Sequence, residues 1–161
     1  MQIRLAKVED AAEACEVLRR SITELCHADH QTDSRNLEAW LSNKTADNVR
    51  SWIADPNTCV VIATDGATII GIGAVTSLGE IILNYVSPAA RFRGVSKAIL
   101  KCLEGTAREL GHTRCAVTST GTARRFYLSA GYLPQGSPTV SFGRIIGYPM
   151  VKHLSSTAPA A

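Results

Sequence analysis

The sequence predicts a single domain of the α+β (mixed α/β) class. Its length of 161 residues suits one domain, and its contents of 45% hydrophobic and 19% charged residues are close to globular averages. Apolar residues recur at helical spacing in some segments and at alternate positions in others, which indicates both helices and strands. Hairpin signals in the middle of the chain precede a strand, helix, strand order, so the sheet is expected to be mixed.

A short strand and three helices are expected in the first third of the chain. Ile3 and Leu5 alternate with polar residues, which predicts a strand over residues 2–6. Asp10 caps a helix in which apolar residues recur every three or four positions, and this helix ends near Cys26. The polar stretch His27–Asn36 predicts a loop. Two shorter helices follow, marked by Leu37, Trp40 and Leu41, and by Val49, Trp52 and Ile53.

Three strands are predicted after the turn Asp55–Asn57. The β-branched segments Thr58–Thr64 and Thr68–Thr76 are joined by the hairpin signal Asp65-Gly66, and a third strand spans Glu80–Val86. The middle of the chain is therefore expected to form antiparallel pairs.

The last third predicts a helix, a strand, a short helix and two more strands. The first helix begins at Val95 and stops at Gly111, and a strand covers Arg114–Ser119. A short helix covers Ala123–Ala130, and two strands run from Tyr132 through Met150. We expect one domain over residues 1–154 and a disordered tail over residues 155–161.

Several classes of protein are excluded by composition. No apolar run approaches the roughly 18 residues of a membrane span, and the start lacks the pattern of a secretory signal, so a cytoplasmic protein without membrane contact is expected. The five cysteines form no C-x-x-C pair, which favours reduced thiols in the core.

Charge is distributed unevenly along the chain. Residues 1–80 hold 7 Lys and Arg against 12 Asp and Glu, whereas residues 81–161 hold 10 against 2, and the whole chain carries +3. The basic residues are not interleaved with aromatic ones as in nucleic-acid patches, so a smaller polyanion is the expected partner of the second half.

The segment from Leu83 to Ala98 has the features of an anion site. A strand enters a loop with Arg91, Arg93 and Gly94, and the loop opens the clearest helix of the chain, whose free N–H groups attract anions. An ordinary connection with two solvated arginines explains the same composition. The G-x-x-x-x-G-K-[ST] and G-x-G-x-x-G patterns of nucleotide loops are missing.

Two motifs in this region resemble one family. Arg91-x-x-Gly94-x-Ser96, after Tyr85-Val86-Ser87-Pro88, is similar to the acetyl-CoA motif Gln/Arg-x-x-Gly-x-Gly/Ala of the GNAT superfamily of N-acetyltransferases, with Ser96 as a mild departure. The segment Ala123–Tyr132 resembles the family's A-x-x-F-Y-x-x-x-G-[FY] segment. The resemblance covers nearly the whole chain except its tail.

The resemblance implies a three-layer fold and an acetyl-CoA site. Its central, mostly antiparallel sheet of about seven strands is flanked by helices, and splayed middle strands hold acetyl-CoA as the acetyl donor. Pantetheine is expected near Tyr85 and Val86, and pyrophosphate on amides of the loop and helix start. The remaining contacts that it implies come from Arg91, Phe92, Arg93, Gly94, Val95, Ser96, Thr120, Ala123, Arg125, Phe126 and Tyr127. Arg124 is the alternative to Arg125, and Thr120 stands where many relatives carry Asn.

The implied reaction is direct attack of a primary amine on the thioester. An alkyl amine is only about 0.04% neutral at pH 7, so a base or a water relay must remove its proton. Glu80 stands where some relatives carry their base, and strand alternation predicts that it shares a face with Ile82, Asn84 and Val86. A solvated carboxylate is the alternative for Glu80. Tyr127 matches the family's tyrosine that protonates the thiolate, or it packs against the sulfur.

The acceptor is a small molecule or a protein, and the acidic first half mildly favours a cationic one. Asn84, His27, His30 and Trp40 are the candidate acceptor contacts, although loop and core roles explain the histidines and Trp40 equally. No metal site and no nucleic-acid contact are predicted. A non-catalytic acyl-CoA sensor or interaction module is the alternative function. A homodimer through the edge Phe142–Met150 is the expected assembly if the chain associates.

Overall fold

The computed structural model describes residues 1–141 and 144–155, with the side chains of residues 144 and 145 left aside. Its helices are α1 (Ala11–Leu25), α2 (His27–His30), α3 (Ser34–Leu41), α4 (Ala46–Ala54), α5 (Val95–Glu109) and α6 (Arg124–Ser129). Its strands are β1 (Gln2–Leu5), β2 (Thr58–Asp65), β3 (Thr68–Thr76), β4 (Glu80–Val86), β5 (Arg114–Ser119), β6 (Leu133–Pro134), β7 (Thr139–Ser141) and β8 (Arg144–His153). Short 3-10 turns cover Val8–Asp10 and Pro88–Ala90.

The strands form one mixed sheet in the order β1-β2-β3-β4-β5-β8-β6, with β7 paired to β8 at its side. Within the described residues β4 and β5 are parallel and the other pairs are antiparallel. This mixed, mostly antiparallel sheet confirms the predicted fold class, with eight strands where about seven were expected.

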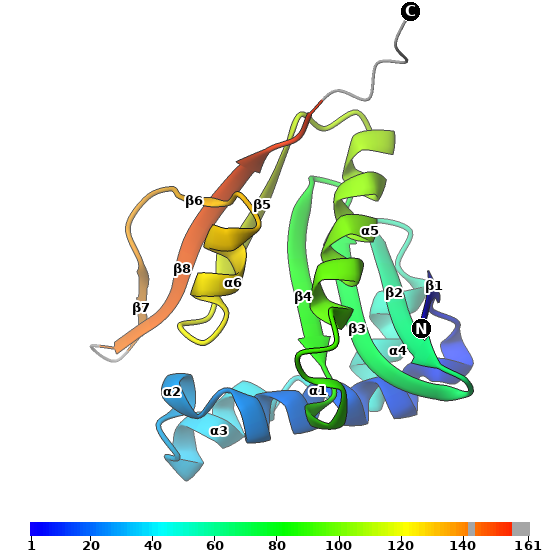
Figure 1. Ribbon diagram of the computed structural model, residues 1–161. Coiled ribbons are helices and arrows are strands. Elements are labelled where there is room, and N and C mark those ends of the chain that lie inside the picture. Colours follow the sequence, from blue (N-terminus) through cyan, green and yellow to red (C-terminus); the bar gives the residue numbers. More distant parts are fainter. Residues whose placement is uncertain (142–143, 156–161) are drawn as a thin grey trace, which may run out of the picture.

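Helices cover both faces of the sheet and give three layers (Figure 1). On one face, Val95, Ile99 and Leu103 of α5 pack with Val61 of β2. On the other face, Leu18 and Ile22 of α1 pack with Ile62, Ile72 and Leu83 of the sheet. The residues that recur at three and four residue spacing in α1 and α5 are therefore the core, as predicted.

Two segments differ from their predictions. The stretch His27–Asn36, predicted as a loop, contains α2, and α3 begins within it at Ser34. The carboxylate of Asp33 accepts hydrogen bonds from the N–H groups of Arg35 and Asn36 and thereby starts α3 at Ser34, three residues before the first apolar residue, Leu37. The two strands expected after Tyr132 are three, because the run that pairs antiparallel with β8 is interrupted and forms β6 and β7 separately.

Two sequence predictions fall partly outside the described residues. The edge predicted for a homodimer begins at Phe142, and the predicted tail covers residues 155–161. All five cysteines are free, as expected, and Cys15, Cys26 and Cys115 are buried. None of the helices in residues 1–141 and 144–155 is both long and apolar enough to cross a bilayer.

Candidate active site

A cavity of about 530 Å³ opens where β4 and β5 separate. The two strands pair only at Glu80 with Ala116 and at Ile81 with Val117. Beyond these pairs they diverge toward the end of the molecule where α1 lies (Figure 1). The main chain of β4 from Leu83 to Val86 therefore has no strand partner on its β5 side. Backbone N–H and C=O groups need a partner, and an extended ligand in the gap would provide one.

A bulge in β4 lies at the point of divergence, directly after the last pair with β5. Ala74 of β3 pairs with Leu83 and Val75 pairs with Ile81, so Ile82 is an extra residue. Ile81 consequently packs on the α5 face while Leu83 packs on the α1 face. The predicted alternation, in which Glu80 and Asn84 share a face, is wrong because the bulge shifts it by one position.

The loop before α5 lines one end of the cavity. Gly94 takes a left-handed conformation (φ 77°) at the helix start, and no side chain caps α5. The first-turn N–H groups are thus free to bind an anion, and Arg91 and Lys97 add positive charge at the same end. Phe92 is 90% exposed, with φ 63°, and the Arg91 guanidinium lies 4.5 Å from its ring centre.

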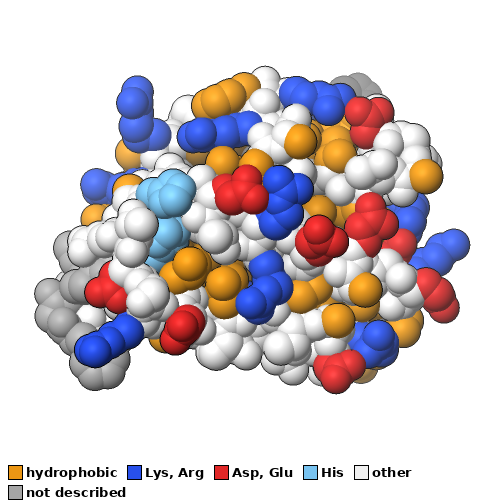
Figure 2. All heavy atoms as spheres, turned by 90° about the horizontal axis from the view of Figure 1, so that it is seen from below, with side chains coloured by type: hydrophobic (Ala, Val, Ile, Leu, Met, Phe, Trp, Pro, Cys, Tyr) orange, Lys and Arg blue, Asp and Glu red, His pale blue; other side chains and the backbone are white. Residues whose placement is uncertain are grey.

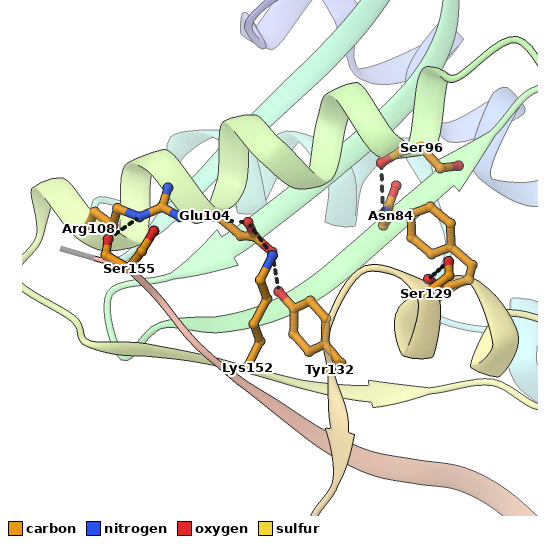
Figure 3. Close-up of polar contacts among 9 residues, drawn as sticks. Asn84, Ser96, Glu104, Arg108, Ser129, Tyr132, Lys152 and Ser155 are labelled. Atoms are coloured by element: carbon orange, nitrogen blue, oxygen red, sulfur yellow. Dashed lines mark hydrogen bonds and ion pairs between the residues drawn. The ribbon is translucent and has the colours of Figure 1, made fainter. Parts of the chain in front are cut away.

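Tyr127 and Asn84 face the cavity from opposite sides of the gap. Burial raises the pKa of Tyr127 to about 12, although the nearby Asn84 amide opposes this shift in part. Tyr127 therefore remains protonated at neutral pH. The Asn84 side chain donates from Nδ2 to the Ser96 carbonyl (3.3 Å; Figure 3), while its buried Oδ1 has no partner among the described residues. An orphaned buried acceptor in a cavity wall suits a ligand that donates a hydrogen bond.

Cys26 and Tyr85 also line the cavity, at the end near α1. The pKa of the Cys26 thiol is raised to about 12, mainly by burial and to a smaller extent by the Asp29 carboxylate. Burial raises the pKa of Tyr85 as well, with Trp40 opposing the shift. Both groups are neutral near pH 7, so Cys26 lacks the thiolate that a covalent route would need.

Most of the residues predicted to contact the cofactor line this one cavity. The structure brings together Asn84, Tyr85, Val86, Arg91, Phe92, Gly94, Val95, Ser96, Thr120, Ala123, Phe126 and Tyr127. Arg93 is not among them, because its guanidinium pairs with Asp65 of the β2–β3 hairpin (2.7 Å). Arg125 is exposed on α6, and the guanidinium of Arg124 stacks on Tyr148 (4.6 Å), so neither side chain lines the cavity.

The other predicted residues lie elsewhere. Glu80 is exposed at the first β4–β5 pair and does not line the cavity. His27 is exposed, and His30 is 2% exposed with its Nδ1 accepting from the Thr32 N–H and its Nε2 3.2 Å from the Thr23 carbonyl. Trp40 packs in the α1-side core. The contacts of His30 and Trp40 are therefore with other parts of the fold and not with the cavity.

The cavity wall contributed by α1 was not predicted. Ser21, Leu25 and Cys26 line it, together with Val117–Ser119 of β5 and Thr122. The sequence held one signal for this wall, because Ser21 is a polar residue within the apolar stripe of α1, where it is buried. No Asp or Glu of the described chain lines the cavity. On the end of the molecule seen in Figure 2, acidic and basic side chains are interspersed rather than gathered into an acidic patch.

A family model described as "Acetyltransferase (GNAT) domain" matches residues 26–154. This match covers most of the chain and includes both motifs that face the cavity. The chain belongs to the GNAT acetyltransferase family. No protein of curated function matches it.

Solved structures share the fold of this GNAT domain along nearly its whole length. A GCN5-related N-acetyltransferase from Rhodopseudomonas palustris is 23% identical, with 95% of each chain covered and a TM-score of 0.82. The PaiA N-acetyltransferase from Thermoplasma acidophilum, in complex with coenzyme A, is 18% identical, with 95% of this chain and 98% of that chain covered and a TM-score of 0.81. YncA, a putative acetyltransferase from Salmonella typhimurium with acetyl-CoA, is 20% identical, with 100% and 98% covered and a TM-score of 0.72.

The two segments that resemble GNAT motifs lie on different walls of the cavity. Arg91, Gly94 and Ser96 line the β4–α5 wall, and Ala123, Phe126 and Tyr127 line the α6 wall. Within residues 1–141 and 144–155, no group of three His, Cys, Asp or Glu side chains is placed to hold a metal ion.

Proposed function

We propose that the protein binds acetyl-CoA in the β4–β5 cavity and transfers the acetyl group to a primary amine. One observation carries this proposal: the uncapped start of α5 and the buried Tyr127 open into the same cavity from opposite sides. The first provides an anion site and the second a proton donor. Two of the similar structures contain coenzyme A or acetyl-CoA, which supports the same ligand here.

The residues of the cavity fit the parts of acetyl-CoA. The N–H groups at the start of α5, with Arg91 and Lys97, would hold the pyrophosphate. The unpaired edge of β4 from Leu83 to Val86 would pair with the amides of the pantetheine arm, and the orphaned Oδ1 of Asn84 would accept one hydrogen bond. The basic second half of the chain is the half that would surround this polyanion.

The transfer needs one new bond and one broken bond. The amine nitrogen attacks the thioester carbon, a C–N bond forms, the C–S bond breaks, and the sulfur leaves with the electron pair. Tyr127, protonated because of its raised pKa, donates its proton or a hydrogen bond to that sulfur. Burial raises the pKa of a thiol in the same direction as that of the phenol, which favours proton transfer to the leaving sulfur.

The proton of the attacking amine is removed by water in this proposal. No Asp or Glu of the described chain lines the cavity, and Glu80 lies at the closed end of the β4–β5 gap, outside it. Water connected to the open mouth is therefore the better candidate, and the acceptor reacts as the neutral amine. The fraction of neutral amine rises tenfold per pH unit below its pKa, so the rate is expected to follow the acceptor pKa.

Melting and thiol release on one sample test the proposal. Acetyl-CoA is expected to raise the melting temperature by mass action, and a panel of amines is expected to release free thiol. Tyr127→Phe should lower kcat by about 10² or more while the shift in melting temperature is retained. Tyr148→Phe, which alters a tyrosine outside the cavity, is the matched control and should keep wild-type kcat.

Each contrary outcome points to a different conclusion. Stabilisation without thiol release on any amine would favour a non-catalytic acyl-CoA sensor. The absence of stabilisation at saturating acetyl-CoA would contradict acetyl-CoA binding itself.

A further inference from the structure

Asp29 connects two segments that lie far apart in the sequence, at the open end of the β4–β5 gap. Its Oδ1 accepts a hydrogen bond from the Gly121 N–H (2.6 Å). Its Oδ2 accepts from the Thr122 N–H (3.0 Å) and from the Thr122 hydroxyl. Gly121 and Thr122 belong to the loop that leads from β5 into α6, whereas Asp29 lies on α2. The carboxylate therefore ties the first half of the chain to the segment that carries Tyr127.

The position of Asp29 is fixed from the side of α1. The neighbouring His30 is buried, its Nδ1 accepts from the Thr32 N–H (3.1 Å), and its Nε2 lies 3.2 Å from the Thr23 carbonyl of α1. Because Nδ1 accepts, Nε2 carries the hydrogen and donates to that carbonyl. Gln31 and Thr32 both have positive φ values (54° and 57°), which turn the chain sharply after α2. The His30 contacts hold α2 on the end of α1.

The loop that receives these bonds is fitted to the carboxylate. A Cβ at Gly121 would lie 3.0 Å from Oδ1 of Asp29, so glycine gives the room for the close approach. No side chain makes a capping hydrogen bond at Ala123, which precedes α6. The Thr120 hydroxyl accepts from the Ala123 N–H (3.1 Å), and the Tyr127 N–H donates to the Ala123 carbonyl (3.1 Å). The tether thus acts on the loop directly before α6, five and six residues before Tyr127.

Strand pairing does not hold Tyr127 at a set distance from β4. The β4–β5 ladder ends at Ile81 and Val117, and beyond it the strands diverge. Asp29 supplies a contact across the same opening at its far end. The carboxylate accepts from two N–H groups and a hydroxyl. Such charge-assisted hydrogen bonds are stronger than those between neutral groups, and here they hold two consecutive residues of the loop.

We propose that Asp29 is a positioning residue that sets the place of the Tyr127 hydroxyl opposite β4. This proposal rests on the role of Tyr127 proposed above. Asp29 does not line the cavity, so it acts through Gly121, Thr122 and the start of α6. Loss of the tether lets α6 move away from β4, and a misplacement of about 1 Å in a reacting group costs on the order of 10²-fold in rate.

Kinetics of Asp29 variants test the proposal against a matched control. Asp29→Ala is expected to lower kcat by about 10-fold to 100-fold and to change the KM for acetyl-CoA by less than about threefold. Asp29→Asn keeps one acceptor oxygen and should give an intermediate kcat. The control is Asp33→Ala, which removes a nearby carboxylate that also accepts from two backbone N–H groups, but only within its own helix start. A kcat of Asp29→Ala within about threefold of this control would overturn the proposal.

A double-variant cycle separates positioning from a general loss of structure. In the Tyr127→Phe background, Asp29→Ala is expected to change kcat by less than about threefold, because the group that it positions is gone. The full loss of kcat in that background would mean that Asp29 does not act through Tyr127, and would overturn the proposal.

Hydrogen exchange of backbone amides and the NMR ring resonances of Tyr127 test the positioning role without any measurement of catalysis. Asp29→Ala should speed the exchange of the Gly121 and Thr122 amides and shift the Tyr127 ring resonances, whereas Asp33→Ala should leave both unchanged. Unchanged exchange and ring signals in Asp29→Ala would overturn the positioning role even if no amine is acetylated. An absence of transferase activity in the wild type, with these changes present, would contradict only the proposed function.

Discussion

We predict that Glu104 stabilises the fold, because its contacts join the two parts of the sheet that the cavity separates. Glu104 lies on α5 and its side chain is 7% exposed. It accepts from the Tyr132 hydroxyl (3.0 Å) and from the Lys152 ammonium (3.0 and 3.1 Å; Figure 3). α5 packs on β2, β3 and β4, whereas Tyr132 and Lys152 lie beyond the gap, with Lys152 on β8. Glu104→Ala removes this link and leaves both partners without their acceptor.

The structure sets the expected cost of Glu104→Ala. Removal of one partner of a buried ion pair costs about 3–5 kcal/mol. The Lys152 side chain is 26% exposed, so its ammonium can reach water, and the lower end of that range applies. The Tyr132 hydroxyl cannot do so, because this residue is fully buried. We expect a loss of about 3 kcal/mol in the free energy of unfolding, or about 6–12 °C in Tm for a domain of this size.

Urea unfolding at pH 7 measures this loss, with the m-value as a check that the unfolding transition is unchanged. Glu109→Ala, an exposed carboxylate on the same helix, is the matched control and should lie within about 0.5 kcal/mol of the wild type. The triple variant Glu104→Leu, Tyr132→Phe, Lys152→Leu removes all the polar groups together and should recover most of the stability. A Glu104→Ala variant within about 1 kcal/mol of the wild type would refute the reasoning.

Three further predictions concern the cavity. Gly94→Ala places a side chain at φ 77°, which costs about 1–2 kcal/mol, and should weaken acetyl-CoA binding in calorimetry more than it raises the acceptor KM. Cys26→Ala should keep kcat within about threefold, since a thiol with a pKa of about 12 is neutral; a loss of about 100-fold would instead indicate a covalent route. Tyr127 has a pKa of about 12 in the fold and about 10 unfolded, so the stability that it contributes is complete below pH 10 and is lost as pH rises toward 12. Urea unfolding between pH 9 and 12 should therefore show a shallower decline for Tyr127→Phe than for the wild type.

Elements with a strong local period were predictable from the sequence. The apolar spacing of α1 and α5 and the hairpin signal at Asp65-Gly66 predicted elements that the structure confirms nearly to the residue. α2 was missed because its four residues, His27–His30, carry no apolar period and their place depends on contacts of His30 with α1. The bulge at Ile82 was missed for a related reason: a single extra residue in a strand leaves the composition of the strand unchanged.

The parts of the candidate site that carry family motifs could be predicted from the sequence. The parts that form only through contacts between distant segments could not. The loop up to Ser96 and the segment with Tyr127 were assigned by resemblance, and the structure brings them to one cavity. Spacing alone could not show that Arg93 turns to Asp65, because that contact joins elements 28 residues apart. The α1 wall at Ser21 and the tether from Asp29 arise from packing between distant segments, which a single sequence does not record.

The separation of β4 from β5 explains why side chains carry so much of the connection between the two parts of the sheet. A continuous ladder would hold them by backbone hydrogen bonds, but it would also fill the space in which we propose that acetyl-CoA lies. The chain keeps two parallel pairs at one end, a carboxylate tether from Asp29 at the other, and the Glu104 contacts between α5 and β8. We therefore expect these polar side chains to help set the width of the cavity, together with the apolar core shared by α5, β5 and β8. Variants of Asp29 and Glu104 are therefore expected to alter catalysis and stability separately, since the first holds the wall that carries Tyr127 and the second holds the sheet.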